Sequence, residues 1–391
     1  MNAKQWRLIL LVSCAHALVH IFELSLPAVE IDLAREYGVT PKTTGLLSSV
    51  WRFPFGMGAL LAGWLVDRFG APRLLVFYLV GCGVASVLVA QTVPLPMLFL
   101  VMFAMGAAAS IYHPAGLALL SYETTAENRT KALGIHGIFG SAGIGGAPFL
   151  AAAVLFSGGS WQAFYWWLAA AGVALGAVFW SWGRRHPRVA EHRQRNQVSA
   201  EQNAVDWNSY AILVTLGMLQ GFTYSAVMTF LRRYVHAIPG NLTQWAGEDA
   251  AVTGAILLVG CVGQFIAGTW ARPRKLESQL FFVIVATIPA LAWMGLAQGP
   301  LRIVAAALFV LVHFMHQPIY NTLVAKYSSL RRRSLAYGFS FAMGLGVGSV
   351  GATFAGFMPT PAAAYFRLTI AVLIGAVVAS VLWWRNHRLA G

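Results

Sequence analysis

The chain has 391 residues, of which 58% are hydrophobic and only 10% are charged, and its mean hydropathy is +0.66. A soluble domain carries about a quarter charged residues, so this composition excludes a water-soluble protein. In a soluble chain the formal charge of +14 would suggest a nucleic-acid partner. Here most of the lysines and arginines fall in alternate polar loops, which is the pattern of a membrane protein, and no nucleic acid is expected.

Apolar stretches of about 20 residues recur along the chain, and each has the length of a helix that crosses the hydrocarbon of a bilayer. In chain order the predicted spans are residues 6–27, 43–66, 73–92, 96–121, 131–156, 160–182, 207–231, 249–270, 277–297, 300–325, 334–357 and 362–384. Only helices and closed barrels satisfy their own backbone in lipid, so the sequence predicts an all-α protein with about twelve transmembrane helices. Because the basic loops lie on the cytoplasmic side, we expect a multi-pass protein of the cell inner membrane with both termini in the cytoplasm.

A long polar stretch divides the chain. Residues 184–206 are basic at their start and contain nothing that could fill a core, which predicts a cytoplasmic linker between six-helix bundles formed by residues 1–183 and 207–391. An internal repeat supports this division. Shifting the chain by about 204 residues superposes five pairs: Pro114 on Pro318, Arg129 on Arg333, Ala132 on Ala336, Gly134 on Gly338 and Gly140 on Gly344. Repeated halves with a binding site between them are typical of secondary transporters.

The segment GWLVDRFGAPR, residues 63–73, follows the second predicted span. It resembles the loop signature of the major facilitator superfamily, and the resemblance implies two pseudo-symmetric six-helix bundles. A glycine at position 63 permits close helix contact. Asp67 lies at a cytoplasmic helix end and is expected to pair with Arg129 while the transporter faces outward. We predict an inner gate built from Gly63, Asp67, Arg68 and Arg129.

Three further segments are similar to the fosmidomycin-resistance-type efflux branch of that superfamily: HALVHIFELSLPA, YHPAGLALL and ENRTKALGI. The fifth predicted span, GIHGIFGSAGIGGAPFL, resembles a glycine-rich antiporter motif in which alanines replace some of the glycines. These resemblances imply proton-coupled export of a small molecule by antiport. Met102 stands where many family members carry an arginine tied to proton exchange, so the proton site must lie elsewhere.

Ionisable groups are costly inside a bilayer, and each is a candidate functional residue. His16, His20 and Glu23 follow one another at i, i+4 and i+7, which places them on one face of the first helix. Arg52 lies at a comparable depth in the second helix. A network of Glu23 or a histidine with Arg52 would act as a proton switch, with a purely structural polar network and snorkelling to the interface as the alternatives.

The other candidate cavity residues lie on later helices. The resemblance places helices one, four, seven and ten around a central cavity, and these helices supply His113, Gln220, Tyr224, His316 and Asn321. Together with the four residues of the first two helices, they form the predicted site for a small solute and protons.

Several alternatives stay open. Arg52 could bind a carboxylate, which would suit uptake of an organic anion or metabolite by proton symport, and metal transport is a further alternative. The pairs in HALVH and HFMH could present two imidazoles on one helix face, as a membrane enzyme or metal protein would. We nevertheless expect the protein not to be an enzyme, and we expect no catalytic residues, no cofactor and no metal site. We also expect a monomer. The sequence does not specify the substrate.

Overall fold

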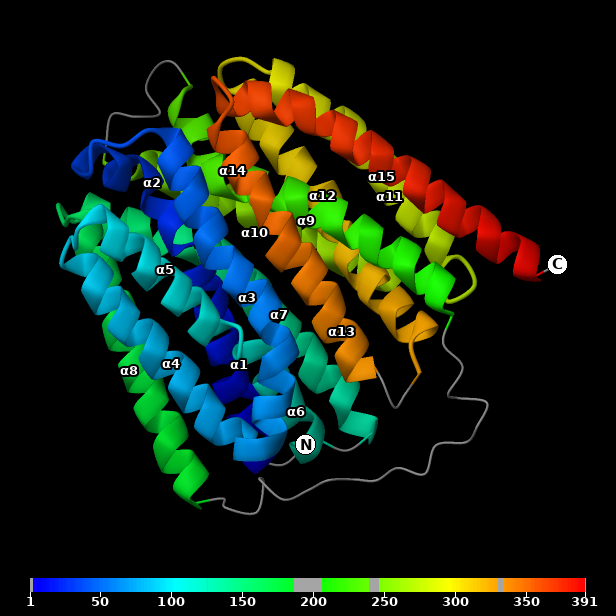
Figure 1. The fold of residues 1–391 in the computed structure, drawn as a ribbon, viewed down its shortest axis with the longest axis horizontal. Helices are drawn as coiled ribbons and strands as arrows, with labels where there is room; N and C mark the ends of the chain where they lie inside the picture. The colour runs from blue at the N-terminus through cyan, green and yellow to red at the C-terminus, as the bar shows by residue number, and fades with distance from the viewer. Residues whose placement is uncertain (1–2, 125, 186–205, 239–245, 330–332, 391) are drawn as a thin grey trace.

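The chain is helical along nearly its whole length in the computed structural model (Figure 1). The structure describes residues 3–124, 126–185, 206–238, 246–329 and 333–390. The first half contains α1 (Ala3–Glu23), α2 (Ser25–Glu36), α3 (Pro41–Phe69), α4 (Ala71–Ala90), α5 (Leu95–Ala109), α6 (Tyr112–Glu123), α7 (Ala126–Phe156) and α8 (Trp161–Arg185). The second half contains α9 (Trp207–His236), α10 (Glu248–Trp270), α11 (Leu276–Leu296), α12 (Leu301–Tyr327), α13 (Arg333–Phe341), the π-helical turn η5 (Ala342–Gly346), the 3₁₀ turn η6 (Val347–Ser349), α14 (Val350–Gly356) and α15 (Pro361–Ala390).

The number of membrane crossings agrees with the prediction. Within the described residues, 11 helical stretches are long and apolar enough to cross a membrane. Helix α3 has 29 residues and is long enough for a further crossing, although Arg52 is buried in its middle and several serines, threonines and glycines lower its hydropathy. The expected all-α membrane fold is confirmed.

Two crossings of the first half are interrupted, and a proline explains each break. A proline has no N–H to donate, and its ring crowds the carbonyl four residues before it. Pro27 lies four residues after Glu23, where α1 ends, and Pro114 lies four residues after Ser110, where the chain passes from α5 to α6. Both interruptions therefore fall beside predicted site residues, namely Glu23 and His113.

The helices of each half pack mainly on one another. In the first half α4 packs on α8, α1 on α7 and α3 on α5; in the second half α10 packs on α12, while α11 and α9 pack on α15. Helices α8 and α15 lie at opposite sides of the molecule (Figure 1). The halves meet where α3 contacts α14 and η5, where α7 contacts α10, and where α2 contacts α9. Residues 186–205 of the predicted linker lie outside the described residues, so the division into bundles at 184–206 stays a prediction.

The internal repeat has a structural counterpart. Gly140 and Gly344, which the 204-residue shift superposes, each face the first helix of their own half. A side chain at Gly140 would meet the ring of His16 on α1, and Gly344 packs against Gly217 and Gly221 on α9. Helix α1 and helix α9 therefore occupy equivalent positions in the two halves.

Four predicted spans miss a helix end by five residues or more, and two of these errors involve charged residues that bear on the site. The first span was predicted to end at residue 27, but α2 continues to Glu36; the seventh was predicted to end at residue 231, but α9 continues to His236. The charged residues in both extensions look like loop residues in the sequence. They are helical because, as described below, the acids of α2 pair with the arginines of α9.

The two ends of the bundle differ in how closely the halves approach. We call the end where α8 finishes and α9 begins the linker end, and the opposite end the far end. Toward the far end, a Cβ on Gly45 of α3 would lie 2.6 Å from the Ala352 carbonyl oxygen of α14. Toward the linker end, a Cβ on Gly63, Gly134 or Gly268 would meet no described atom within 4 Å. The halves are therefore packed together at the far end.

Candidate functional site

The predicted face of the first helix forms the core of the site. Glu23 ends α1 and is 3% exposed, so its carboxylate needs buried partners. The Nδ1 atom of His20 lies 2.8 Å from Glu23 Oε2, and the Nε atom of Arg52 lies 3.4 Å from Glu23 Oε1. His20 and Glu23 lie one helical turn apart on α1, and Arg52 approaches Glu23 from α3. The structure therefore brings these three predicted residues together.

Arg52 connects the two halves. It is wholly buried in α3, and its Nη1 atom donates to Ser48 Oγ one turn away and, at 2.9 Å, to Thr229 Oγ1 on α9. Its Nη2 atom is buried and has no hydrogen-bond partner among the described residues. A buried cation with an unused N–H pair is costly to the fold, because the desolvation of that group is not repaid. Arg52 therefore has the geometry of an anion-binding group with Glu23 as its only carboxylate neighbour among the described residues.

Tyr224 adds a group from the second half to the same carboxylate. Its hydroxyl lies beside the Glu23 carboxylate, and its ring lies parallel to that of His313 with the centroids 6.4 Å apart. Two further members of the site, Ser48 and Thr229, were missed in the sequence. Ser48 could have been found, because it precedes Arg52 by four residues and shares its helix face. Nothing in the sequence identifies Thr229.

The first half also contains a cluster of aromatic rings around His16. The rings of His20 and His113 lie 5.0 and 5.4 Å from that of His16, and the ring of His136 stacks on it at 3.9 Å. The hydroxyl of Tyr112 donates to the Val12 carbonyl at 2.8 Å and accepts from His136 Nε2 at 2.9 Å. His16, His20 and His113, all members of the predicted site, are therefore brought together in the structure.

The remaining candidates of the second half lie apart from Glu23 and Arg52. His316 donates from Nδ1 to the carbonyl of His313, and the carbonyl of Asn321 accepts from the Tyr337 hydroxyl at 2.8 Å. The side-chain amide of Gln220 is buried and faces α15, where a Cβ on Gly375 would lie 3.6 Å from it. The structure thus joins Tyr224 to the site and leaves Gln220, His316 and Asn321 outside its immediate contacts.

The predicted inner gate lies at the linker end. Asp67 and Arg68 are exposed at the end of α3, and the Arg68 guanidinium lies 5.3 Å from the Trp64 ring centroid. Gly63 has open space around it, as noted above. The side chain of Arg129 lies outside the described residues, so its pairing with Asp67 stays a prediction.

Ion pairs between α2 and α9 hold the far end together, and the sequence did not predict them. Arg233 donates to both oxygens of Glu30 at 2.9 and 3.0 Å. Arg232 donates to Asp32 at 2.6 Å and also lies 3.1 Å from Asp249 of α10. We call these five residues the far-end latch. A bidentate arginine–carboxylate pair is the strongest form of such a contact, so the latch favours the state closed at the far end.

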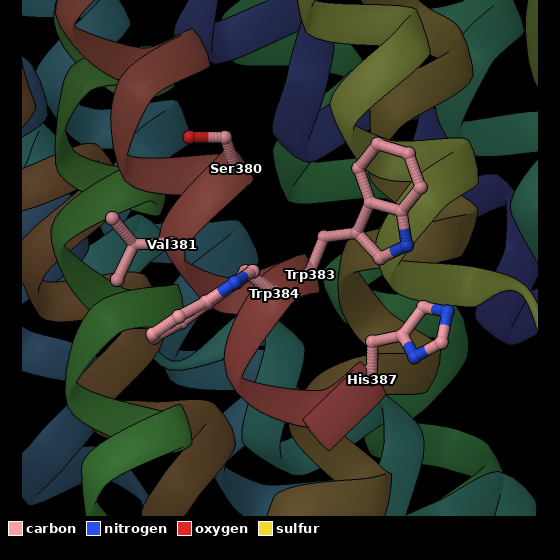
Figure 2. A pocket seen from close by; sticks show the side chains of 5 residues that line it. All are labelled: Ser380, Val381, Trp383, Trp384 and His387. Carbon is pink, nitrogen blue, oxygen red and sulfur yellow. The ribbon is translucent and has the colours of Figure 1, made fainter. Parts of the chain in front are cut away.

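A separate hollow lies on the surface of α15 (Figure 2). All the side chains that line it come from this one helix: Ser380, Val381, Trp383, Trp384 and His387. Val381 and Trp384 are about half exposed. Tryptophans near a helix end are typical anchors at a membrane interface. None of the five lining residues belongs to the central site.

The sequence profile of the Major Facilitator Superfamily matches residues 11–353. The chain therefore belongs to the Major Facilitator Superfamily, as the resemblance implied.

Two relatives have names that describe anions. The chain is similar to the "Probable sulfoacetate transporter SauU" of Cupriavidus necator, with 23% identity over 288 residues that cover 68% of this chain and 64% of that protein. It is also similar to the "Sodium-dependent phosphate transport protein 1, chloroplastic" of Arabidopsis thaliana, with 28% identity over 153 residues, 38% of this chain and 30% of that protein. The chain thus spans less than two thirds of the length of either relative.

Solved structures share the fold. A bacterial homolog of the human lysosomal transporter Spinster, in an inward-facing and unoccupied conformation, superposes with a TM-score of 0.73 at 15% identity over 98% of this chain and 96% of that one. The nucleoside transporter NupG gives the same TM-score and identity over 97% and 98% of the two chains.

Proposed function

We propose that this chain carries a small organic anion across the membrane together with a proton. The single observation that carries the proposal is the Arg52 side chain, which is wholly buried at the contact of the two halves and has an unused Nη2. A guanidinium offers paired N–H donors that match a carboxylate, sulfonate or phosphate. The relatives named for sulfoacetate and phosphate support an anion of this kind.

The position of Glu23 supports proton coupling. In the resting site Glu23 neutralises Arg52, so an incoming anion competes with that carboxylate. A proton on Glu23 removes the competition and leaves the charge of Arg52 for the anion. Each of the two ligands therefore raises the affinity for the other, which is the thermodynamic requirement for co-transport.

The net charge of the site also supports co-transport of a proton with the anion. With His20 neutral, the empty site contains one negative and one positive charge, and the site loaded with a monovalent anion and a proton is also neutral. A site with only one of the two ligands would bear a net charge, and moving such a charge through a low-dielectric interior is costly. Symport of one proton with one monovalent anion is thus the cycle that this geometry supports best.

Export by proton antiport, which the efflux-type resemblance implies, is the other outcome of a direct test. The purified chain is reconstituted in liposomes and offered a monovalent carboxylate, a monovalent sulfonate or dihydrogen phosphate with a proton gradient of either direction. Symport predicts that the anion accumulates on the side toward which protons flow. Accumulation against the proton flow would establish antiport, and no movement of any small anion would refute the proposal.

We further propose an orientation in the inner membrane. The distribution of basic residues supports a cytoplasmic location for the linker end and both termini. In this orientation the latched far end is outside and the described state faces inward. Alternating access then requires the far-end latch to break and the predicted inner gate of Asp67 and Arg129 to form. We propose that a monomer performs this cycle with its two six-helix bundles.

A further inference from the structure

Three histidines converge beside the Glu23–Arg52 pair. His16 and His20 come from adjacent turns of α1, and His113 comes from the start of α6, just after the break between α5 and α6. One ring nitrogen from each lies within 4.8 Å of the others. The sequence placed His113 in the same predicted cavity, but its distance from the pair on α1 depends on how α6 packs against that helix.

Hydrogen bonds fix which ring nitrogen is available on two of these histidines. His16 Nδ1 lies 2.7 Å from the carbonyl oxygen of His136, and because a carbonyl can only accept, this nitrogen bears the proton. His20 Nδ1 lies 2.8 Å from the Glu23 carboxylate and is the donor there for the same reason. In the neutral form both rings therefore present the lone pair of Nε2. Metal-binding histidines in proteins are held in this way, with the second nitrogen donating to a carboxylate or a carbonyl.

The third histidine has an unused nitrogen. His113 Nε2 is buried and has no hydrogen-bond partner among the described residues. The ring of Phe341 stacks on that of His113 at 5.0 Å, and Phe55 lies 5.8 Å from it, so the imidazole is held among apolar rings. A buried polar atom without a partner is costly, and a ligand that accepts its lone pair removes that cost.

We propose that His16, His20 and His113 bind one transition-metal ion, with Zn²⁺ as the probe. Zn–N bonds of about 2.0–2.1 Å in a tetrahedral site bring the three nitrogens to roughly 3.4 Å from one another, so the rings must close in by about 1 Å or slightly more. Neutral imidazole favours Zn²⁺, Cu²⁺ or Ni²⁺ over Mg²⁺ and Ca²⁺. The fourth position is left for water or an anion.

Metal binding has a consequence that rests on the proposed function. A bound ion would tie α1 to α6 and place two positive charges next to the Glu23–Arg52 pair. It would also give the site a net charge, which is costly to move through the low-dielectric interior during the transport cycle. We therefore expect Zn²⁺ to inhibit transport. The binding of Zn²⁺ itself does not depend on which solute the protein carries or on the direction of transport.

The binding test uses detergent-purified full-length chain, freed of any polyhistidine tag and of metal, titrated with Zn²⁺ in a calorimeter. We expect one Zn²⁺ per chain, with no comparable binding of Mg²⁺. His113→Ala should weaken the binding by more than about tenfold, since it removes one of three ligands. The matched control is His387→Ala, which removes an exposed histidine on α15 (Figure 2) and should bind as the wild type does.

A second measurement keeps the proposal testable if His113→Ala is poorly folded. Co²⁺ replaces Zn²⁺ in wild type and in His20→Gln, and the visible absorption of tetrahedral Co²⁺ is recorded; it should appear in the wild type and be lost in the variant. The proposal is overturned if wild type shows no saturable Zn²⁺ binding, or if folded His113→Ala and His20→Gln bind as well as wild type. Anion transport that persists in metal-free protein leaves the proposed function intact in every case.

Discussion

The two halves of the molecule use equivalent positions for different chemistry. Under the 204-residue shift His16 corresponds to Gln220 and His20 to Tyr224, on helices α1 and α9. In the first half these positions adjoin a charged pair and a histidine cluster. In the second half Tyr224 contributes a neutral hydroxyl, and Gln220 faces α15. Repeated halves therefore need not share a mechanism: the first half has the groups suited to protons and anions, and the second supplies neutral contacts.

The largest effect should come from removing the buried cation of the first half. Arg52→Ala deletes the proposed anion contact and leaves Glu23 buried without its partner, a loss of about 3–5 kcal/mol or at least about 100-fold in transport. Uptake by reconstituted protein measures it. Arg52→Lys is the matched variant, since it keeps the charge but loses the planar pair of donors, and it should retain a small fraction of the activity. Full transport by Arg52→Ala would show that the Glu23–Arg52 pair is not required for transport.

The far-end latch tests how the halves move relative to each other. Glu30→Gln removes one charge from the bidentate pair with Arg233, which is worth about 1.5 kcal/mol or roughly tenfold in the closed-to-open equilibrium. Spin labels on Glu36→Cys and Ala237→Cys, in a cysteine-free background, report the distance between the ends of α2 and α9. We expect a longer-distance population to grow. Arg35→Gln, which changes an exposed charge on α2, is the control and should leave the distances unchanged.

The loop motif gives a smaller contrast between the halves. If Asp67 clamps the opposite state through Arg129, Asp67→Asn should lower the rate of transport about fivefold, in the range of a coupling of 1 kcal/mol, while membrane insertion is normal. The second half has Arg272 in the corresponding loop and no acid, so Arg272→Gln should change the rate less than twofold, within about 0.4 kcal/mol. Equal effects of the two variants would show that the inner gate is symmetric.

The smallest effect is expected at a buried histidine of the second half. Neither ring nitrogen of His313 has a hydrogen-bond partner among the described residues, and its ring stacks on Phe309 at 5.0 Å. His313→Phe keeps the shape and removes two unsatisfied polar atoms, so transport should change less than about twofold and the Tm should be equal or higher. A tenfold loss of proton-driven transport would instead place a titrating group in the second half.

Part of the site could be predicted because His20 and Glu23 lie on one helix. The spacing of His20 and Glu23 on a single face, and the equal depth of Arg52, follow from helix geometry, and the structure brings these three residues into contact. The crossings themselves follow from the length and apolarity of the spans. Arg52 was identified because a charge in a span needs a buried partner.

Contacts between helices could not be predicted in the same way. The orientation of Gln220 toward α15 and of Thr229 toward Arg52 depends on how α9 is rotated about its axis, which no single-helix pattern specifies. The latch was missed for a different reason. Glu30 and Arg233 follow apolar segments and look like solvated ends, although each is satisfied by the other across the interface.

The proposed proton coupling depends on Glu23, and a variant at this residue is its most direct test. Wild type and Glu23→Gln are reconstituted in liposomes and compared in two assays: anion accumulation under a pH difference, and anion exchange at equal pH. One proton per anion predicts about tenfold accumulation per pH unit in the wild type, because one unit corresponds to about 1.36 kcal/mol. Glu23→Gln should lose this accumulation and still catalyse exchange, since Arg52 and the cavity are intact. Wild-type accumulation by folded Glu23→Gln would contradict the proposed proton coupling.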